Sequence, residues 1–373
     1  MRVVLTGGGT GGHVYPALAI AEAFAAEPAF APLAIDFVGT ADGLEARIVP
    51  KAGLPLHVVR AAALQRRLGL GTLRTLGTNL RGVIEAVALL RQLRPDVLIA
   101  TGGYVSLPVV AALRLLRALG RSRARIAVLE PNAAAGLTNR LLAPLVDTVW
   151  YAIAPADRHL RMGESIVGVP VRASMRRPLA RDEARRQLGL AEDGFVIVVV
   201  GGSQGARSIN EAVAGYVEAG VAPGTHVVVV AGDRDYAALH ARLAGRPGAT
   251  VLAYLDDPRV AYAAADIVVA RAGASTLGEL AATATPALLV PYPFATANHQ
   301  EHNARAFAAA GAARIVADRD LDAERLRREL AAALEPPALA ALRSAAARGA
   351  TDDPCATIVA RVKTWSASKT NAS

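Results

Sequence analysis

The stretch LTGGGTGGH, Leu5 to His13, decides how the first half of the chain is organised. It follows a short apolar run at residues 2–6 that is typical of a strand. It precedes residues 14–26, whose apolar side chains recur at helical spacing. The order strand, glycine loop, helix predicts the start of a doubly wound α/β domain. Because such a loop turns backbone N–H groups and the positive end of the helix dipole toward one point, it suits a phosphate group.

A dinucleotide cofactor is the first alternative to test. Gly7, Gly9 and Gly12 match the fingerprint G-x-G-x-x-G, which is followed by an acidic residue at the end of the second strand. The second strand-like run, residues 35–39, instead holds Asp36 inside it and ends in Gly39. We therefore expect no nicotinamide or flavin cofactor. A glycine-rich turn without any ligand remains the other alternative.

The same arrangement begins again in the second half of the chain. Residues 195–200, FVIVVV, lead into the loop GGSQGA at 201–206, and a helical pattern starts near Ile209. Short strand-like runs alternate with longer helical patterns throughout the 373 residues, which favours parallel sheets. We expect two Rossmann-like, doubly wound domains, residues 1–170 and 171–350, a final helix at 353–365, and ligands in an interdomain cleft at the C-terminal ends of the strands.

Charge and composition narrow the classes of partner. The formal net charge is +9, but aromatic residues make up only 4% of the chain and form no stacking motif, so we expect no nucleic acid. Residues 60–94 contain seven arginines but a single acidic residue, Glu85, and leucines lie between the arginines in the sequence. Basic and apolar residues on one segment predict docking to an anionic membrane surface. A solvated helix face with an ordinary core side is the alternative.

A second small-residue loop in the second half points to a nucleotide sugar. Residues 272–279, AGASTLGE, follow a strand-like run and open a helix. The carboxylate of Glu279 suits the two hydroxyls of a ribose, although a glutamate at a helix start is also a common partner of the helix dipole. The polar run NHQEHN at residues 298–303 opens the next helix and suits a sugar.

Seven motifs that span nearly the whole chain carry a resemblance to a known family. In order they are GGTGGHVYPALA, TGGYVSLP, GLTN, VGVPVR, VGGSQGAR, AGAST with GEL, and NHQEHNA. Together they resemble the MurG family of UDP-N-acetylglucosamine:lipid I N-acetylglucosaminyltransferases of peptidoglycan synthesis. The resemblance implies two domains of the glycosyltransferase B type, a final helix that returns to the first domain, and a peripheral enzyme on the cytoplasmic face of the cell membrane.

The resemblance also implies roles for individual residues. His13 matches the candidate base, and Glu130 is the second catalytic candidate. The positions implied to bind the donor are Thr10, Gly11, Gly12, Asn132, Arg172, Ser203, Leu255, Ala274, Ser275, Thr276, Leu277, Gly278, Glu279 and Gln300. Gly102, Gly103 and Tyr104 are candidates on the acceptor side, and no metal is expected. Leu129 and Pro131 stand where the family usually has histidine and glutamine, which removes two side-chain hydrogen-bonding groups.

The implied reaction moves N-acetylglucosamine from UDP to the muramyl 4-hydroxyl of lipid I, with inversion to a β-linkage and release of UDP. Three other interpretations remain: a diacylglycerol glycosyltransferase, a UDP-N-acetylglucosamine 2-epimerase, and a nucleotide-sugar sensor without chemistry. The positive end of the helix after the glycine loop favours a neutral His13 that can accept a proton. A histidine that only binds phosphate or caps the turn is the alternative.

Overall fold

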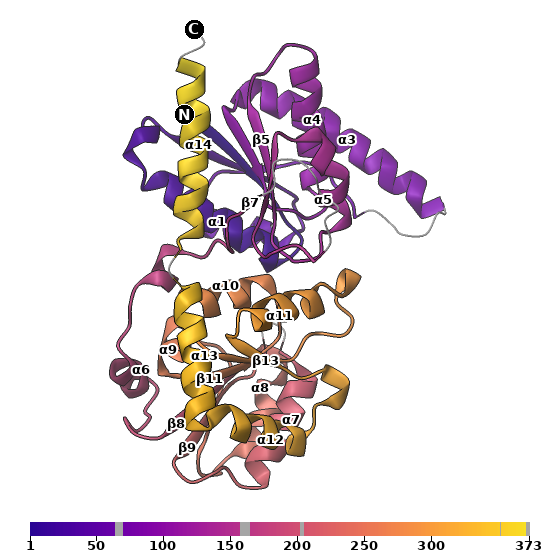
Figure 1. The fold of residues 1–373 in the computed structure, drawn as a ribbon. Helices are drawn as coiled ribbons and strands as arrows, with labels where there is room; N and C mark the ends of the chain where they lie inside the picture. The colour runs from indigo at the N-terminus through magenta and orange to yellow at the C-terminus, as the bar shows by residue number, and fades with distance from the viewer. Residues whose placement is uncertain (64–69, 157–164, 202–204, 351, 371–373) are drawn as a thin grey trace. The chain divides into compact units, whose positions relative to one another are not determined.

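The structure is a computed structural model that describes residues 1–63, 70–156, 165–201, 205–350 and 352–370. The chain divides into two compact units (Figure 1). The first unit comprises Met1–Ala173 with Asp353–Ser373, and the second comprises Ser174–Asp352. Arg172 therefore belongs to the first unit, whereas the sequence placed it in the second.

The first unit is built on a seven-stranded parallel sheet in the order β3-β2-β1-β4-β5-β6-β7. Its strands are β1 (Arg2–Thr6), β2 (Ala34–Gly39), β3 (Leu56–Val58), β4 (Val97–Ala100), β5 (Arg125–Glu130), β6 (Thr148–Tyr151) and β7 (Ser165–Ile166). The strand order reverses direction between β1 and β4. In open parallel sheets ligands bind at such a reversal, outside the carboxyl ends of the strands.

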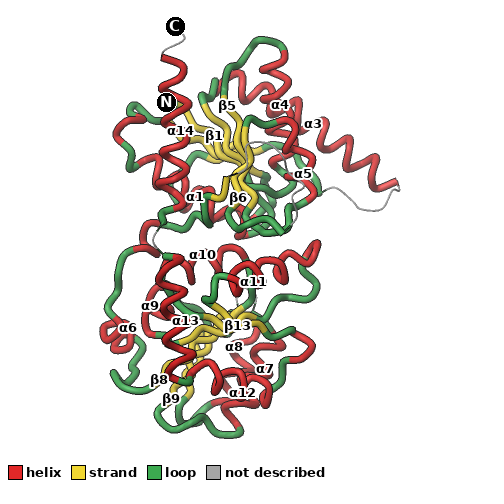
Figure 2. The backbone as a smooth tube through the Cα atoms, in the orientation of Figure 1, coloured by secondary structure: helices red, strands yellow, loops and turns green. Residues whose placement is uncertain are grey.

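Helices cover both faces of this sheet (Figure 2). They are α1 (Gly11–Ala25), α2 (Leu44–Lys51), α3 (Leu70–Leu93), α4 (Ser106–Ala118), α5 (Leu137–Leu142) and α14 (Pro354–Thr370). Alternate residues of β1 point to opposite faces: Val4 packs in the cluster that includes α3 and α4, and Leu5 in the cluster that includes α1 and α14. This burial on both sides explains why the strands read as continuous apolar runs.

The last helix, α14, packs against α1 of the first unit. Ile358 and Val362 are fully buried in the cluster of α1, and the ring of Trp365 stacks on Trp150 with 5.7 Å between centroids. The helix extends to Thr370, five residues beyond the end expected from the sequence.

The second unit repeats the strand order of the first. Its sheet runs β10-β9-β8-β11-β12-β13, with β8 (Phe195–Val200), β9 (Thr225–Val230), β10 (Ala249–Leu252), β11 (Ile267–Ala270), β12 (Ala287–Leu289) and β13 (Ala313–Ile315). The helices are α6 (Arg181–Gln187), α7 (Arg207–Glu218), α8 (Asp233–Leu243), α9 (Pro258–Ala264), α10 (Ala274–Ala282), α11 (His299–Ala309), α12 (Ala323–Leu334) and α13 (Pro336–Gly349). The order reverses between β8 and β11, where the second pair of small-residue loops lies.

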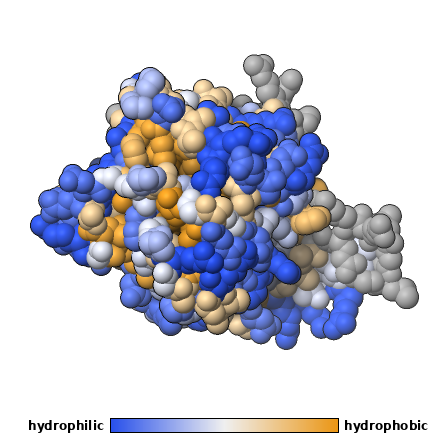
Figure 3. Space-filling view, turned by 90° about the horizontal axis from the view of Figure 1, so that it is seen from below, coloured by the Kyte–Doolittle hydropathy of each residue, from blue (hydrophilic) through white to orange (hydrophobic). Residues whose placement is uncertain are grey.

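The surface carries some exposed apolar side chains among mostly polar ones. On the face drawn in Figure 3, hydrophilic residues surround smaller apolar areas. No helix in the described part of the chain is both long and apolar enough to cross a membrane.

Candidate active site

The glycine loop after β1 lies directly against the loop after β4. The N–H of Gly8 donates to the carbonyl of Gly102 over 3.3 Å, and the hydroxyl of Thr101 donates to the carbonyl of His13 over 2.7 Å. A Cβ on Gly103 would lie 2.2 Å from the Gly8 oxygen, and Gly103 has a φ of +84°. Only glycine is compatible with this approach. The strand reversal thus brings Gly102 and Gly103 against the loop that leads to His13.

His13 lies in the first turn of α1, which begins at Gly11 after the N-cap Thr10. Its Nδ1 is 2.9 Å from the carbonyl oxygen of Thr101. Because a carbonyl only accepts hydrogen bonds, Nδ1 carries the proton, and the neutral imidazole has its lone pair on Nε2. This arrangement fixes both the tautomer and the orientation of a ring that can accept a proton at Nε2.

Glu45 is a buried carboxylate beneath the glycine loop that the sequence analysis missed. It is fully buried and accepts hydrogen bonds from the Gly9 N–H at 3.1 Å, the Thr40 N–H at 3.1 Å and the Thr40 hydroxyl at 2.7 Å. The N–H groups of Gly8 and Gly9 are therefore used within the protein. A phosphate at this loop would therefore not be bound by these two N–H groups.

Tyr104 lies beside the same loop. A Cβ on Gly9 would be 3.0 Å from its ring, and its hydroxyl is 3.5 Å from the Thr40 hydroxyl oxygen. The ring is half-buried. The three acceptor-side candidates, Gly102, Gly103 and Tyr104, therefore gather with His13 at one edge of the sheet.

Glu130 ends β5 at the same edge and is only 1% exposed. One carboxylate oxygen accepts from the backbone and side-chain amides of Asn132, at 2.9 and 3.3 Å. The other accepts from the Gly136 N–H at 3.0 Å and the Asn139 amide at 2.8 Å. Burial raises the pKa of Glu130, and these four donors oppose that shift. In this structure Glu130 holds Asn132 and the turn that contains it.

In the second unit, the loop after β11 leads into α10 with Gly273 as N-cap. The sequence placed Glu279 about one turn inside this helix, and it is the sixth helical residue, beyond the first turn. An effect of the helix dipole is weak there. The carboxylate instead accepts a hydrogen bond from the Tyr262 hydroxyl group over 2.8 Å. Burial and the adjacent carboxylate raise the pKa of Tyr262 well above its usual value, so the phenol keeps its proton.

The small-residue loop also contains a buried hydroxyl. The Oγ of Ser275, in the first turn of α10, has no hydrogen-bond partner among the described residues. An unpaired buried hydroxyl is costly unless a ligand or water completes its bonding.

Gln300 connects two loops at the carboxyl edge of the second sheet. Its side-chain oxygen accepts from the N–H groups of Ala272 at 3.1 Å and Tyr292 at 3.0 Å. The amide of Asn303 donates to the Ala272 carbonyl over 3.1 Å. Gln300 is therefore placed beside the loop that continues into Ala274–Glu279, with its oxygen used and its NH₂ group left as the donor.

Arg271 is a second group that the sequence analysis missed. Its guanidinium donates to Asp318 at 2.5 Å, to Ser208 at 2.8 Å and to the Val290 carbonyl at 3.1 Å, and it lies over the ring of Tyr292. Within the described residues, no group of three or more histidine, cysteine, aspartate or glutamate side chains is arranged to hold a metal ion.

The remaining residues implied to bind the donor are Arg172, Ser203 and Leu255. Ser203 lies outside the described residues. Arg172 is exposed, near the end of the first segment of its unit. Leu255 is half-buried in the loop that follows β10.

Helix α3 exposes an apolar stripe that we call the α3 stripe: Leu73, Leu76, Leu80 and Ile84, which are 53–69% exposed. The side chains that α3 buries include the polar Thr75 and Asn79, the latter hydrogen-bonded twice to the backbone of Ala62 at 3.0 Å. A solvated helix face has the opposite distribution. Arg74 and Arg81 are exposed on the same helix, whereas Arg66 and Arg67 lie outside the described residues.

The chain is similar to known proteins over most of its length. The N-terminal domain model of glycosyltransferase family 28 matches residues 3–151, and the C-terminal domain model matches residues 196–354. The chain is 42% identical to a UDP-N-acetylglucosamine--N-acetylmuramyl-(pentapeptide) pyrophosphoryl-undecaprenol N-acetylglucosamine transferase from Desulforudis audaxviator, over 92% of this chain and 93% of that protein. It is 43% identical to the protein of the same name from Moorella thermoacetica, over 87% and 88%.

Solved structures show the same architecture. The crystal structure of Acinetobacter baumannii MurG has a TM-score of 0.77 and 26% identity, with 97% of this chain and 99% of that chain covered. A UDP-GlcNAc 2-epimerase from Neisseria meningitidis has a TM-score of 0.65 over 98% of this chain and 100% of that chain, but at 10% identity the likeness concerns the fold alone.

Proposed function

Because the chain belongs to the family of UDP-N-acetylglucosamine--N-acetylmuramyl-(pentapeptide) pyrophosphoryl-undecaprenol N-acetylglucosamine transferases, we propose that it moves N-acetylglucosamine from UDP-N-acetylglucosamine to lipid I. The product is lipid II, the disaccharide-bearing precursor of peptidoglycan. The chain is thus a glycosyltransferase of cell-wall synthesis. The observation that carries its chemistry is the hydrogen bond from His13 Nδ1 to Thr101.

In the proposed step, Nε2 of His13 takes the proton of the muramyl 4-hydroxyl. The oxygen attacks the anomeric carbon of N-acetylglucosamine, the bond from that carbon to the diphosphate oxygen breaks, and UDP leaves with the bonding electrons. A positioned base of this kind contributes about two to four powers of ten to the rate. The Thr101 carbonyl supports the base, because it stabilises the imidazolium that forms after proton transfer.

Glu130 acts in this proposal as a positioning residue. Its two oxygens are occupied by four donors and its side chain is 1% exposed, which leaves it no direct access to substrate. By holding Asn132, it keeps in place a side chain implied to bind the sugar. The Asn139 amide donates to Glu130 and to the Leu129 carbonyl, and so supports the segment in which Leu129 and Pro131 carry no side-chain hydrogen-bonding group.

The second unit binds the donor in this proposal. Glu279 accepts hydrogen bonds from the ribose hydroxyls, and the Gln300 NH₂ donates to the sugar. Residues Ala274 to Gly278 line the nucleotide, with the N–H groups of the first turn, Ala274 to Thr276, as donors, because the Leu277 N–H is already bonded to the Gly273 carbonyl. The contact from Tyr262 supports this role for Glu279, since the hydrogen bond orients the carboxylate. Arg172, Ser203 and Leu255 remain proposed contacts of the diphosphate and the uracil. No metal takes part in the proposed step.

The α3 stripe is proposed to dock on the anionic cytoplasmic face of the cell membrane. Four neighbouring apolar side chains that are more than half exposed lose contact with water when they enter a lipid interface. Arg74 and Arg81 on the same helix are attracted by anionic lipids. The lipid-linked acceptor is held in that membrane, so docking brings the protein to its substrate.

The test is incubation of the purified chain with labelled UDP-N-acetylglucosamine and a short-chain lipid I analogue. We expect a β-1,4-linked disaccharide on the lipid and stoichiometric UDP. Formation of N-acetylmannosamine derivatives without lipid product would indicate an epimerase. Binding of the sugar nucleotide without turnover would indicate a sensor. Either outcome contradicts the proposal.

A further inference from the structure

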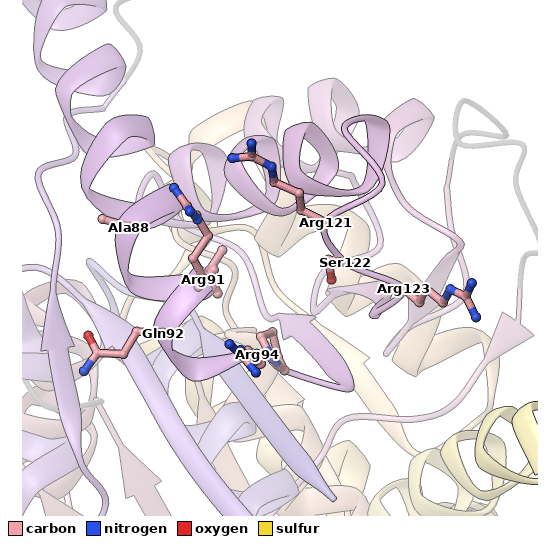
Figure 4. Close-up of a pocket in the computed structure, with 9 residues that line it drawn as sticks. Ala88, Arg91, Gln92, Arg94, Arg121, Ser122 and Arg123 are labelled. Carbon is pink, nitrogen blue, oxygen red and sulfur yellow. The ribbon is translucent and has the colours of Figure 1, made fainter.

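A hollow of about 810 Å³ lies at the amino edge of the sheet in the first unit (Figure 4). One wall is the end of α3 and the turn after it, with Arg91 and Arg94. The other wall is the loop between α4 and β5, with Arg121, Ser122 and Arg123. These two segments immediately precede β4 and β5. The candidate active site follows the same strands, so the hollow is a separate site at their opposite ends.

Four arginines line this hollow without a carboxylate partner. None of Arg91, Arg94, Arg121 and Arg123 forms an ion pair within the described part of the chain. The neighbouring acid Asp147 is already bound by Arg117, at 2.7 and 3.0 Å, and by the Ile126 N–H at 2.7 Å. Among the described residues, the four guanidinium groups are therefore not neutralised by direct ion pairs.

The negative ends of helix dipoles offset only part of the positive charge of these arginines. The hollow lies at the C-terminal ends of α3 and α4, and cations there offset the negative end of each dipole. Each helix end is equivalent to about half an elementary charge, so two helices balance about one of the four arginines. About three positive charges remain to attract an anion.

Backbone hydrogen bonds fix the two walls in place. Arg94 follows α3 with a φ of +48°, and its N–H donates to the Leu90 carbonyl over 2.9 Å. Gly120, two residues after the end of α4, has a φ of +67°, and the N–H of Arg121 donates to the Leu116 carbonyl over 2.8 Å. These are the bonds of a helix C-cap, which order the chain from which the arginines project.

We propose that this hollow binds a multiply charged phosphate group, either of a soluble diphosphate or of a phosphomonoester lipid headgroup. Arginine suits this ligand because its planar guanidinium donates two parallel hydrogen bonds to phosphate oxygens. Several guanidiniums around one hollow favour two or more negative charges over a single carboxylate. The proposal is independent of the proposed transferase activity.

The test for a soluble anion is calorimetric titration of the full chain with inorganic pyrophosphate, with excess UDP present to fill a nucleotide site. Arg91→Ala/Arg121→Ala is the test variant, and Arg47→Ala/Arg114→Ala removes the same charge from exposed positions outside the hollow. We expect the test variant to weaken binding at least about tenfold, since charge-assisted contacts are lost, and the control by less than about twofold. Thermal unfolding of both variants checks that they fold.

The test for a lipid uses vesicles of phosphatidylcholine that carry either phosphatidic acid or an equal charge of phosphatidylserine. A preference for phosphatidic acid that only the test variant loses assigns the site to a lipid headgroup. Pyrophosphate binding without this preference assigns it to a soluble anion. Equal losses in test and control variants, or no binding in either assay, overturn the proposal.

Discussion

The Nδ1–H of His13 donates to the carbonyl oxygen of Thr101, the first residue after β4, over 2.9 Å. This bond makes Nε2 the basic nitrogen of the neutral ring. We predict that His13→Ala lowers kcat at least about a hundredfold, in the range for loss of a general base, and changes the affinity for UDP-N-acetylglucosamine by less than about threefold. Single-turnover kinetics and donor titrations measure the two quantities. A variant whose whole defect is donor affinity would show that His13 is a phosphate ligand.

Glu45→Ala removes the acceptor of three buried or partly buried donors at the glycine loop. We predict that it lowers the free energy of unfolding of the first unit by about 2–4 kcal/mol, because each unsatisfied buried group costs about 1–3 kcal/mol. Both tryptophans of the chain, Trp150 and Trp365, lie in this unit, so urea unfolding followed by tryptophan fluorescence reports on it selectively. The exposed Asp42→Ala in the same segment is the control and is expected to stay within about 0.5 kcal/mol. Equal stability of the two variants would contradict the bracing role.

Glu279→Ala is predicted to weaken binding of UDP about ten- to a hundredfold, because it removes a pair of charge-assisted hydrogen bonds worth about 1.5–3 kcal/mol. Tyr262→Phe keeps the carboxylate and loses only the bond that orients it, so we expect a smaller loss. Equilibrium titration with UDP measures both. The exposed Glu324→Ala, on α12 of the same unit, is the matched control. If UDP binds the Glu279 variant and the control equally well, Glu279 does not contact the nucleotide.

The two halves of the fold could be predicted from the sequence because each sheet has a central strand, β1 or β8, that is a continuous apolar run followed by a glycine loop. β1 and β8 were found in this way with the same bounds as in the structure. β7 was missed, since it has only two residues, of which Ile166 is 59% exposed. Such a short strand has no pattern of its own and forms by pairing with β6.

The candidate site could be predicted where a local motif positions a residue, as it does for His13 in the first helical turn after the glycine loop. It was not predictable where the partner is distant in sequence. Glu45 is separated by 36 residues from Gly9, and Arg271 by 47 residues from Asp318, so neither contact leaves a local signal. Of these two residues, only Glu45 has a feature in the sequence that indicates its contacts: Thr40 and several glycines lie close to it or in the loop above it. A Cβ at Gly8, Gly39 or Gly43 would lie within 2.6 Å of its side chain, so these positions must stay small.

Glu130 provides a pH-dependent test. Its folded-state pKa is raised by burial, so its contribution to stability is present below the unfolded-state pKa and is lost as the pH rises through the folded-state pKa. Glu130→Gln places an NH₂ group against the hydrogen-bond donors that surround the carboxylate, and the new side chain cannot titrate. We predict that it lowers the free energy of unfolding by about 1–3 kcal/mol. The difference in free energy of unfolding between wild type and variant should grow as the pH falls from neutral toward the ordinary pKa of a glutamate. Urea unfolding by tryptophan fluorescence at several pH values measures it, and a difference that shrinks toward acid pH contradicts the raised pKa.

The α3 stripe provides the test of membrane docking. Leu76→Gln/Leu80→Gln removes two side chains that are 53% and 64% exposed, and Leu137→Gln/Leu141→Gln makes the same change on α5, where the leucines are 45% and 46% exposed. If α3 enters the lipid interface, the first variant loses roughly 1 kcal/mol or more of membrane-binding free energy per leucine, since full burial of a leucine is worth about 1.5–3 kcal/mol. We therefore expect at least a tenfold weaker partition onto vesicles with anionic lipid, measured by cosedimentation, while UDP binding is unchanged. Because the control makes the same two substitutions at partly exposed leucines of another helix, equal partition of both variants would mean that α3 does not face the membrane.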